Sequence, residues 1–456
     1  MRFCVGTTAP QKGYETMKKI AVIVILILLT ACAPTEKSYI NYDPIEHNFL
    51  PYQTPFKTNE NGYLYLTREQ VLEDYYYMWK TLEENAPYLS FMPDYPRWAD
   101  NTPEQIKERY AEIIKNAPEK VLLHQYHGYI NDTLLELNPV GHIGIAGNYI
   151  HEMMRTIFAE MAETAPQEWR NVLHNLSELA NNEKTNEFYR LVYGATDSGY
   201  VDITDNYSFE EIFDSGNQLG MAEDSVPYIR ISSFITPAKF TFEYEEYSVA
   251  RYKAFLEQNK NAENIIIDIR GNGGGSTNIW SKCIVELLIA QGEKLPNYEF
   301  LGVLDGGLNT YIRGEDYPYN LREDWQDIFP NITDVTQFDR LVSNDNYSAD
   351  SDNSIGFNGN IWLLVDGGCY SASEAFTIFC KQTGFATVVG TQTGGSGVGG
   401  NPYAFPLPNS GLLIRYEGWY AFNDDGTCNQ IVGTKPDIDV GRRDALEVCL
   451  ELIAAG

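Results

Sequence analysis

The chain has 456 residues, a formal net charge of -30 at pH 7 and 43% hydrophobic residues. This length and hydrophobic content predict a globular protein with two or more structural units. The acidic excess argues against nucleic acid and an anionic membrane surface as partners, because phosphate binding requires clustered Lys and Arg, and no such cluster is present.

The N-terminal segment predicts export and a lipid anchor. Lys18 and Lys19 precede the apolar run Ile20 to Leu29, which is too short to span a bilayer and suits a signal sequence. The run ends in Leu29-Thr30-Ala31-Cys32, which resembles a bacterial lipoprotein signal whose cysteine is lipidated. We expect residues 1–31 to be removed, with Met17 as the true start.

This resemblance implies a soluble body outside the cytoplasm, in the bacterial cell envelope, anchored through Cys32 to the outer rather than the inner membrane. The lipid is then the only expected membrane contact. An odd number of cysteines follows Cys32, at irregular spacing and without a Cys-x-x-Cys pair, which predicts buried thiols rather than disulfides or a zinc site. These cysteines are Cys283, Cys369, Cys380, Cys428 and Cys449.

The first half of the chain is expected to be mostly helical. Residues 32–66 are polar and rich in Pro, Asn and Tyr, which predicts a tether between the anchor and the body. Thr67 and Thr102 each begin a capping-box pattern followed by apolar residues at helical spacing. We therefore expect 67–225 to be helical, with one short strand at 141–147, where small and β-branched residues alternate.

From residue 226 to 456 strands alternate with helices. Buried strands are expected at 228–231, 264–269, 300–304 and 361–365, with helices at 243–258 and 279–289. This order predicts an α/β fold with a largely parallel sheet and crossover helices. The stretch 305–359 is predicted to be irregular, with a solvated acidic loop at 345–352 rather than a calcium site.

Ser371 lies where the strand 361–365 breaks on Gly367-Gly368 and a helix begins. A hydroxyl at such a junction lies beside the unpaired N–H groups of the first helical turn, including that of Ala372, which suit an oxyanion. The competing interpretation is structural, because Ser371 and Glu374 have the spacing of a capping box. Taken alone, this pattern favours the capping box.

A second glycine turn, 271–275, follows the strand 264–269. Ligands of open α/β sheets bind beyond the carboxyl ends of the strands, so the two turns can face one crevice. A bare glycine amide in this turn would then be a second oxyanion donor opposite Ala372. The alternative is a dinucleotide-binding turn, but Ser276 replaces its third glycine and no acidic residue ends the following strand.

A serine nucleophile needs a base from elsewhere in the chain. Lys381 lies roughly 15 Å along the same helix and cannot reach the hydroxyl. His142 stands out among the six histidines because glycines flank it on a strand of small residues, although a structural histidine is the competing interpretation. His124 and His127 have helical spacing but no third ligand, so no metal site is predicted.

Four motifs occur in order along the chain. They are Ile266-Ile267-Asp268-Ile269-Arg270 with its glycine turn, Ser371-Ala372-Ser373-Glu374, Gly390-Thr391-Gln392-Thr393-Gly394-Gly395 and Gly433-Thr434-Lys435-Pro436-Asp437-Ile438. Together they resemble the C-terminal processing peptidase and tricorn-core family of serine peptidases over 226–440, and more loosely around Gly141-His142. The resemblance implies a crotonase-like or ClpP-like core, Ser371 as nucleophile, oxyanion donors near Gly273 and at Ala372, and no cofactor.

Two branches of this family differ in their base. Members with a Ser–Lys dyad carry a lysine where this chain has Ser396, and usually a PDZ domain, which is not evident between His142 and residue 226. The tricorn-like branch uses a histidine in a Gly-His setting, which His142 supplies. That branch also places a serine and a glutamate where this chain has Gly141 and Gln430, so Gln430 is the doubtful candidate for orienting the base.

We therefore expect a serine peptidase that hydrolyses peptides or unfolded proteins through an acyl-enzyme, with Ser371 and His142 as its catalytic pair. Lys435 is the next candidate for the base. The alternative is an envelope lipoprotein that retains the peptide-binding cleft without turnover. An α/β-hydrolase is not expected, because its elbow requires Gly-x-Ser-x-Gly and its histidine follows the serine. The sequence leaves the substrate preference and the oligomeric state open.

Overall fold

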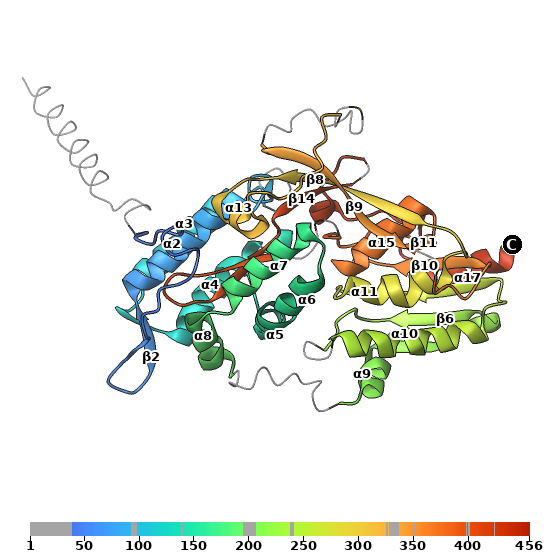
Figure 1. Ribbon diagram of the computed structural model, residues 1–456, viewed down its shortest axis with the longest axis horizontal. Helices are drawn as coiled ribbons and strands as arrows, with labels where there is room; N and C mark the ends of the chain where they lie inside the picture. The colour runs from blue at the N-terminus through green and yellow to red at the C-terminus, as the bar shows by residue number, and fades with distance from the viewer. Residues whose placement is uncertain are drawn as a thin grey trace, which may run out of the picture.

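The computed structural model describes residues 39–92, 98–137, 140–194, 207–237, 241–324, 327, 337–349, 352–397, 399, 402–423 and 425–456. The signal segment and Cys32 lie outside these residues. Two parts lie side by side in Figure 1, a mostly helical front and an α/β part that contains the C-terminus. Within the described ranges, no helix is both long enough and apolar enough to cross a membrane.

The α/β part is built on a six-stranded sheet with the order β15-β11-β10-β7-β6-β5. Its strands are β5 (Asn217–Met221), β6 (Pro227–Ile231), β7 (Asn264–Asp268), β10 (Asn360–Val365), β11 (Thr387–Gly390) and β15 (Ile438–Asp439). Neighbouring strands pair in parallel, except β5 and β6, which are antiparallel. The predicted α/β fold with a largely parallel sheet is confirmed.

Both faces of this sheet are covered by helices, which explains the continuous apolar runs in β7 and β10. Ile267 and Leu363 pack with the helices of one face, and Ile266 and Leu364 pack with α17 on the other. The first group of helices is α10 (Thr241–Gln258), α11 (Thr277–Trp280) with its continuations η7 (Ser281–Val285) and α12 (Glu286–Leu288), and α15 (Ala372–Thr383). The helix α9 (Phe209–Gly216) lies beside α10, and α17 spans Ala445–Ala455.

The front is helical, as predicted, and its first two helices begin with the capping boxes expected at Thr67 and Thr102. Its helices are α2 (Arg68–Asn85), α3 (Pro103–Lys115), α4 (Leu123–Leu137), α5 (Asn148–Glu152), η4 (Met153–Ile157), α6 (Phe158–Thr164), α7 (Gln167–Ala180) and α8 (Glu183–Tyr193). The strand expected at 141–147 is reduced to β4 (Gly144–Ile145), because residues Val140–His142 form the tight helical turn η3.

Residues 39–66 do not form the free tether that their polar composition predicted. Strands β1 (Lys57–Thr58) and β2 (Leu64–Thr67) form an antiparallel sheet with β3 (Lys120–Leu122). Tyr42 and Phe49 are 4% and 5% exposed and belong to the core of the front. Aromatic side chains among the polar residues therefore hold this stretch against the body.

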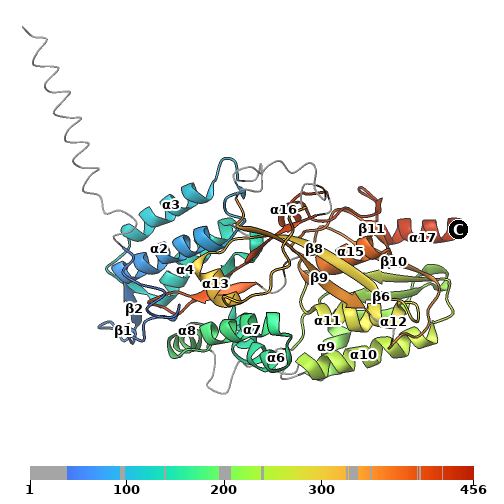
Figure 2. The same cartoon turned by 45° about the horizontal axis from the view of Figure 1, so that its top comes forward.

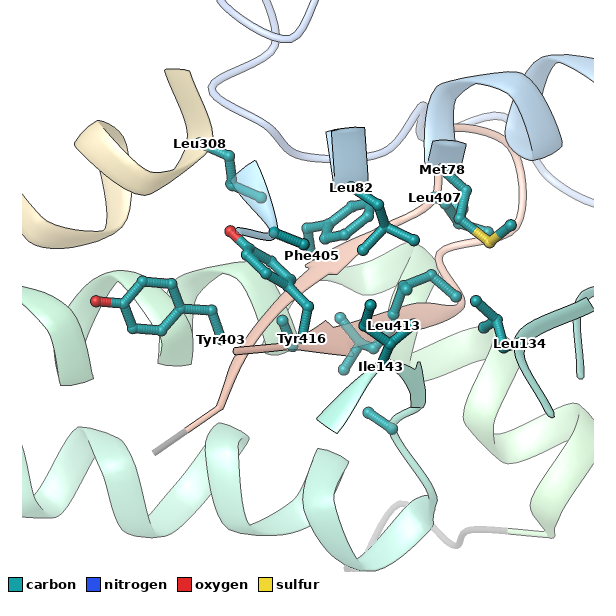
Figure 3. Packing of buried hydrophobic residues seen from close by; sticks show 14 of the residues in the cluster. Met78, Leu82, Leu134, Ile143, Leu308, Tyr403, Phe405, Leu407, Leu413 and Tyr416 are labelled. Atoms are coloured by element: carbon teal, nitrogen blue, oxygen red, sulfur yellow. The ribbon is translucent and has the colours of Figure 1, made fainter. Parts of the chain in front are cut away.

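The boundary predicted at residue 226 does not separate two cores. Strands β12 (Tyr403–Pro406) and β13 (Leu413–Tyr416) pair with β4, and their apolar side chains lie in the core of the front beside α2 and α4, as Figure 3 shows. A third sheet, β14 (Trp419–Phe422), β8 (Leu295–Val303) and β9 (Arg340–Ala349), lies between α13 (Gly307–Arg313) and α15 in Figure 2. Late segments of the chain thus complete the front.

The stretch 305–359 was wrongly predicted to be irregular, since it contains α13 and β9. Part of the acidic run expected as a solvated loop, 345–349, is strand β9, paired with β8. Pairing with an apolar partner strand, rather than the polar sequence of β9 itself, decides its conformation.

A buried carboxylate fixes the β12–β13 hairpin to the front. Asp74 of α2 accepts hydrogen bonds from the backbone N–H groups of Asn409 (2.7 Å) and Ser410 (3.1 Å) and from the hydroxyl of Tyr126 (2.8 Å). Burial raises the pKa of Asp74 to about 6. Since β13 pairs with β4, this attachment also positions the segment that carries His142.

Candidate active site

Ser371 occupies the junction between β10 and α15 in a strained conformation. Its φ is 59° and its ψ is -122°, a region that non-glycine residues rarely adopt and that costs on the order of 1–3 kcal/mol. Its N–H donates to the carbonyl of Gly395 (3.1 Å), while its own carbonyl accepts from Ala375 (2.9 Å) and begins the helix. These two bonds hold the strained backbone in place.

The capping-box interpretation of Ser371 and Glu374 is wrong. The Ser371 side chain makes no capping hydrogen bond to the helix. The buried carboxylate of Glu374 instead accepts from Asn429 Nδ2 (2.8 Å) and Thr434 Oγ1 (2.5 Å), and burial raises its pKa. Because Glu374 ties α15 to the segment 429–434, the Ser371 hydroxyl is left without a structural role at the helix start.

The glycine turn after β7 packs directly against Ser371. Tyr370 N–H donates to the carbonyl of Asn272 (3.1 Å), and Gly274 N–H donates to Asn272 Oδ1 (2.9 Å). Gly274 has a φ of +103°, and a Cβ on it would lie 2.7 Å from Ser371 Cβ. Only glycine therefore allows the two turns to approach this closely.

Gly273 and Ala372 belong to the two segments that approach each other at this contact. Within the described part of the chain, neither N–H has a hydrogen-bond acceptor, and nothing lies within 4 Å of an ideal Cβ on Gly273. Ala372 is the first residue of α15, where backbone N–H groups carry partial positive charge. The two predicted donors thus lie on the two turns that approach each other at Ser371, and their role stays a prediction.

The same turn does not suit a dinucleotide. A Cβ on Gly275 would lie 2.1 Å from the carbonyl carbon of Phe234, so protein backbone fills the space on that side of the turn. A Cβ on Gly368 would meet Gly271 Cα at 2.7 Å. These glycines allow close backbone contacts within the protein. The turn therefore gives no support to the dinucleotide-binding alternative.

His142 ends the turn η3 and is 9% exposed. Both it and Gly141 have positive φ, 53° and 58°, and the carbonyl of Gly141 accepts from Glu417 N–H (2.5 Å). A Cβ on Gly141 would lie 2.6 Å from the ring of Tyr88. This contact explains why the serine expected before the histidine is absent, since any side chain there would displace Tyr88.

The partner of His142 is Glu417, not Gln430. Glu417 Oε2 lies 2.7 Å from His142 Nδ1, and Ser396 Oγ lies 2.9 Å from the same nitrogen. Glu417 is 1% exposed, and burial raises its pKa while the His142 contact opposes that rise. Gln430 is also buried, but neither its side-chain oxygen nor its nitrogen has a partner among the described residues. The expected orienting role of Gln430 is therefore not supported.

Ser371 and His142 both lie next to Tyr370. The rings of His142 and Tyr370 lie 5.2 Å apart, and Tyr370 immediately precedes Ser371. The carbonyl of Gly395 accepts a hydrogen bond from Ser371 N–H, and the hydroxyl of the next residue, Ser396, contacts His142 Nδ1. Neither Ser371 Oγ nor His142 Nε2 has a hydrogen-bond partner in the described chain, so both atoms are free to react.

Other candidates lie elsewhere. Lys381 Nζ is paired with Asp437 (2.5 Å), and Lys435 is exposed. His127 Nε2 lies 2.8 Å from the hydroxyl of Tyr193. The described residues contain no group of three or more His, Cys, Asp or Glu placed to hold a metal ion. The five predicted thiols are all free and buried, as expected.

Glu417 was missed because Gln430 occupies the position that the family resemblance favours. A signal was present, since a glutamate directly follows the largely apolar strand Leu413–Tyr416. Acidic residues are rarely fully buried unless they are paired. A glutamate at the end of an apolar stretch, together with the glycine-flanked His142, was therefore the sequence feature that could have predicted a buried His–Glu pair.

The family comparison indicates a serine-type peptidase. Residues 225–440 match peptidase family S41. This region of the chain resembles that family of serine peptidases, which includes the C-terminal processing peptidases. The match begins one residue before the boundary predicted from the sequence and leaves His142 outside it. A comparison with curated proteins gives no match.

Several solved structures resemble this chain at low sequence identity. A proposed peptidase from Parabacteroides merdae is 15% identical, with 85% of this chain and 97% of that chain covered and a TM-score of 0.47. Mature CPAF is 11% identical, with coverages of 82% and 93% and a TM-score of 0.47. The photosystem II D1 C-terminal processing protease is 17% identical, with coverages of 48% and 45% and a TM-score of 0.31.

Proposed function

We propose that this protein is an endopeptidase that cleaves peptides or unfolded proteins through an acyl-enzyme on Ser371. His142 is the base, and Glu417 positions it. The observation that carries this proposal is the buried pair of His142 Nδ1 and Glu417 Oε2 at 2.7 Å, which leaves Nε2 unpaired beside the Ser371 segment. A carboxylate on Nδ1 favours the tautomer with its proton there, so Nε2 carries the lone pair.

In the proposed mechanism, His142 transfers the proton that Ser371 loses. Ser371 Oγ attacks the peptide carbonyl while His142 Nε2 takes the hydroxyl proton, and the imidazolium then returns that proton to the leaving amine. Water, activated by the same nitrogen, hydrolyses the acyl-enzyme and restores the hydroxyl. Glu417 stabilises the imidazolium in both steps.

The amides of Gly273 and Ala372 are proposed to bind the carbonyl oxygen as it gains negative charge. Both N–H groups are unpaired in the described structure, so they need not give up a bond when the oxyanion forms. The close approach of Gly274 to Ser371 fixes the distance between the turn and the nucleophile. Donors held in place in this way need little reorganisation during the reaction.

The alternative is a peptide-binding protein that retains this cleft without turnover. Gln430 favoured it in the sequence, because the acid expected there is missing. Glu417 weakens that reasoning, since its buried carboxylate, at the residue after β13, reaches the same imidazole. The strained Ser371 also favours catalysis, because such strain persists only when the surrounding structure imposes it.

Labelling with a serine-directed fluorophosphonate separates these two functions. The wild type should be labelled on the peptide that contains Ser371, and Ser371→Ala should not be labelled. Ser373→Ala is a matched control, because Ser373 lies two residues away with a buried hydroxyl and should leave labelling unchanged. A wild type that stays unlabelled while binding peptides would instead support the binding protein.

We further propose a lipid-anchored protein of the bacterial cell envelope, with Cys32 lipidated at the outer membrane and a crotonase-like core. The apolar run Ile20 to Leu29 and its Leu29-Thr30-Ala31-Cys32 end support the anchor. Detergent phase partitioning of protein made in a bacterial host tests it. Wild type should enter the detergent phase and Cys32→Ser the aqueous phase, and the anchor is wrong if both stay aqueous.

A further inference from the structure

Ser396 contacts the proposed base directly. Its Oγ lies 2.9 Å from His142 Nδ1, the same nitrogen that lies 2.7 Å from Glu417 Oε2. All three side chains are buried, so water has little access to these contacts. A serine hydroxyl has one donor hydrogen and two acceptor lone pairs, whereas a carboxylate only accepts. Ser396 Oγ can therefore share the Nδ1 proton with Glu417 and still donate its own hydrogen.

The backbone next to Ser396 is bonded to the nucleophile segment. The carbonyl of Gly395 accepts a hydrogen bond from Ser371 N–H (3.1 Å), and a parallel bridge joins Gly395 to Tyr370. The dipeptide Gly395-Ser396 therefore contacts the serine through its backbone and the base through a side chain. A shift of this dipeptide would change the position of the base relative to the nucleophile.

A short helix holds the residues on both sides of Ser396. Gly397 N–H donates to Asn429 Oδ1 (3.0 Å), and a Cβ on Gly395 would lie 2.2 Å from the carbonyl oxygen of Asn429. Asn429 is fully buried and begins the helix α16 (Asn429–Val432). The segment that carries Ser396 therefore cannot move without displacing α16. Such a fixed support is what a precisely placed catalytic group requires.

The backbone conformation of Ser396 groups it with the proposed catalytic pair. Six residues other than glycine have a positive φ among those that the structure describes. Three of them are His142, Ser371 and Ser396, with φ values of 53°, 59° and 67°. This conformation is costly for a residue with a Cβ, and it persists where the surrounding structure imposes it, most often at functional sites. The strain at Ser396 thus points to a role in the site.

We propose that Ser396 is a positioning residue of the peptidase, which fixes the orientation of the His142 imidazole so that Nε2 is held toward Ser371. A single contact at Nδ1, from Glu417, leaves the ring free to tilt about that contact. A second contact from another segment restricts the tilt. Ser396 acts through the imidazole and does not touch the substrate. The inference rests on the proposed peptidase function and adds a residue to its mechanism.

The first test measures kcat and KM on one internally quenched peptide that the wild type cleaves. Ser396→Ala removes the hydroxyl and should lower kcat by about 10- to 100-fold, because a small misplacement of the base slows the chemical step. KM should change less than about threefold, since the substrate still binds. Ser396→Gly also lacks the hydroxyl but adopts a positive φ without strain, so it should lose as much as Ser396→Ala.

Ser373→Ala is the control for these two variants. Ser373 lies two residues from Ser371, and its buried hydroxyl has no hydrogen-bond partner in the described chain, so the variant should keep the wild-type kcat. A kcat within threefold of wild type in either Ser396 variant overturns the proposal. A loss of kcat/KM that comes mainly from KM also overturns it, because Ser396 would then act on substrate binding.

A double variant tests whether Ser396 acts through His142. Ser396→Ala combined with Glu417→Gln should lose less activity than the product of the two single losses, because both changes act at Nδ1 of one imidazole. Losses that multiply would show that the Ser396 hydroxyl acts independently of the base, and the positioning role would then be wrong.

A spectroscopic measurement separates this inference from the peptidase function. The Nδ1 proton of His142 should give a proton NMR resonance that is absent in His142→Ala. Ser396→Ala should shift this resonance and speed its exchange with water, and Ser373→Ala should leave it unchanged. If the wild type cleaves nothing while the resonance responds in this way, the peptidase function fails and the positioning of the imidazole by Ser396 stands. If cleavage occurs but Ser396→Ala changes neither kcat nor the resonance, the positioning role fails and the peptidase function stands.

Discussion

The two halves of the candidate site are built in different ways. The serine half comes from two neighbouring parallel strands, β7 and β10, and the turns that follow them. The histidine half joins the turn η3 to a strand that lies far later in the chain, since His142 and Glu417 are 275 residues apart. Local sequence defines the first half, and long-range pairing defines the second.

Strain and polarity also differ between the halves. The serine half depends on glycines, because Gly274 and Gly368 sit where a Cβ would collide with the opposite turn. The histidine half depends on buried charge, because Glu417, Glu299 and Arg415 all lie in low-dielectric surroundings. Substitutions in the first half should therefore act through geometry, and substitutions in the second through electrostatics.

The largest effect is expected where the halves meet. Ser371→Ala, His142→Ala and the double variant should each lose roughly 10⁴-fold or more in kcat on an unstructured quenched peptide, because the two residues act as one unit. Thermal melting should show all three folded. The catalytic pair is wrong if Ser371→Ala keeps wild-type activity, or if the losses of the single variants multiply in the double variant.

Within the histidine half, Glu417 and Gln430 form a matched comparison. Glu417→Gln keeps the shape but removes the charge that stabilises the imidazolium, so kcat/KM should fall by roughly 10²- to 10⁴-fold. Gln430→Ala should change it less than about threefold, since the Gln430 side chain makes no hydrogen bond to His142. The measurement is steady-state hydrolysis of one peptide by both variants. A larger loss of kcat/KM in Gln430→Ala than in Glu417→Gln would show that Gln430 orients the base.

Within the serine half, Gly273 allows a comparison at one position. Gly273→Pro removes the proposed oxyanion donor and should lower kcat by roughly 10²- to 10³-fold, with a smaller change in KM. Gly273→Ala keeps the N–H, and its Cβ meets nothing within 4 Å, so it should remain close to wild type. Equal losses in kcat for both variants would show that Gly273 acts only through the backbone conformation of the turn.

The smallest effect concerns stability, through Glu299 of β8. Its buried carboxylate accepts from Gly399 N–H (2.7 Å), and burial, with the nearby charge of Glu417 adding to it, raises its pKa to about 7. Between about pH 4.3 and pH 7 the folded state holds a proton that the unfolded state has lost. This contribution to the free energy of unfolding therefore falls as the pH rises through that window, by at most about 3 kcal/mol.

Glu299→Gln should remove that dependence. Relative to wild type, the variant should gain up to about 3 kcal/mol in its free energy of unfolding between pH 4.5 and pH 8, measured by urea denaturation. Glu257→Gln is the control, because Glu257 is 46% exposed and should show no such gain. A Glu299 variant that tracks the wild type at both pH values would show that this carboxylate is ionised in the folded protein throughout.

The sequence alone determined the parts of this protein that depend on neighbouring residues. Capping boxes at Thr67 and Thr102, the apolar strands β7 and β10, and the glycine turn beside Ser371 all follow from side-chain chemistry within a few residues. These elements were sufficient to predict a parallel α/β core, and the order of the motifs was sufficient to predict the family. Local periodicity and turn chemistry carry this information because they require no distant partner.

The tertiary structure decided what depends on partners far along the chain. It turned the expected tether into part of the front, placed β12 and β13 in the core of the front, and made a strand of the acidic stretch in β9. It also pairs the imidazole of His142 with the carboxylate of Glu417 rather than with the side chain of Gln430. Pairing of β13 with β4 decides which acid reaches the imidazole. The sequence of an apolar strand does not identify its pairing partner, because many apolar strands would pair with it equally well.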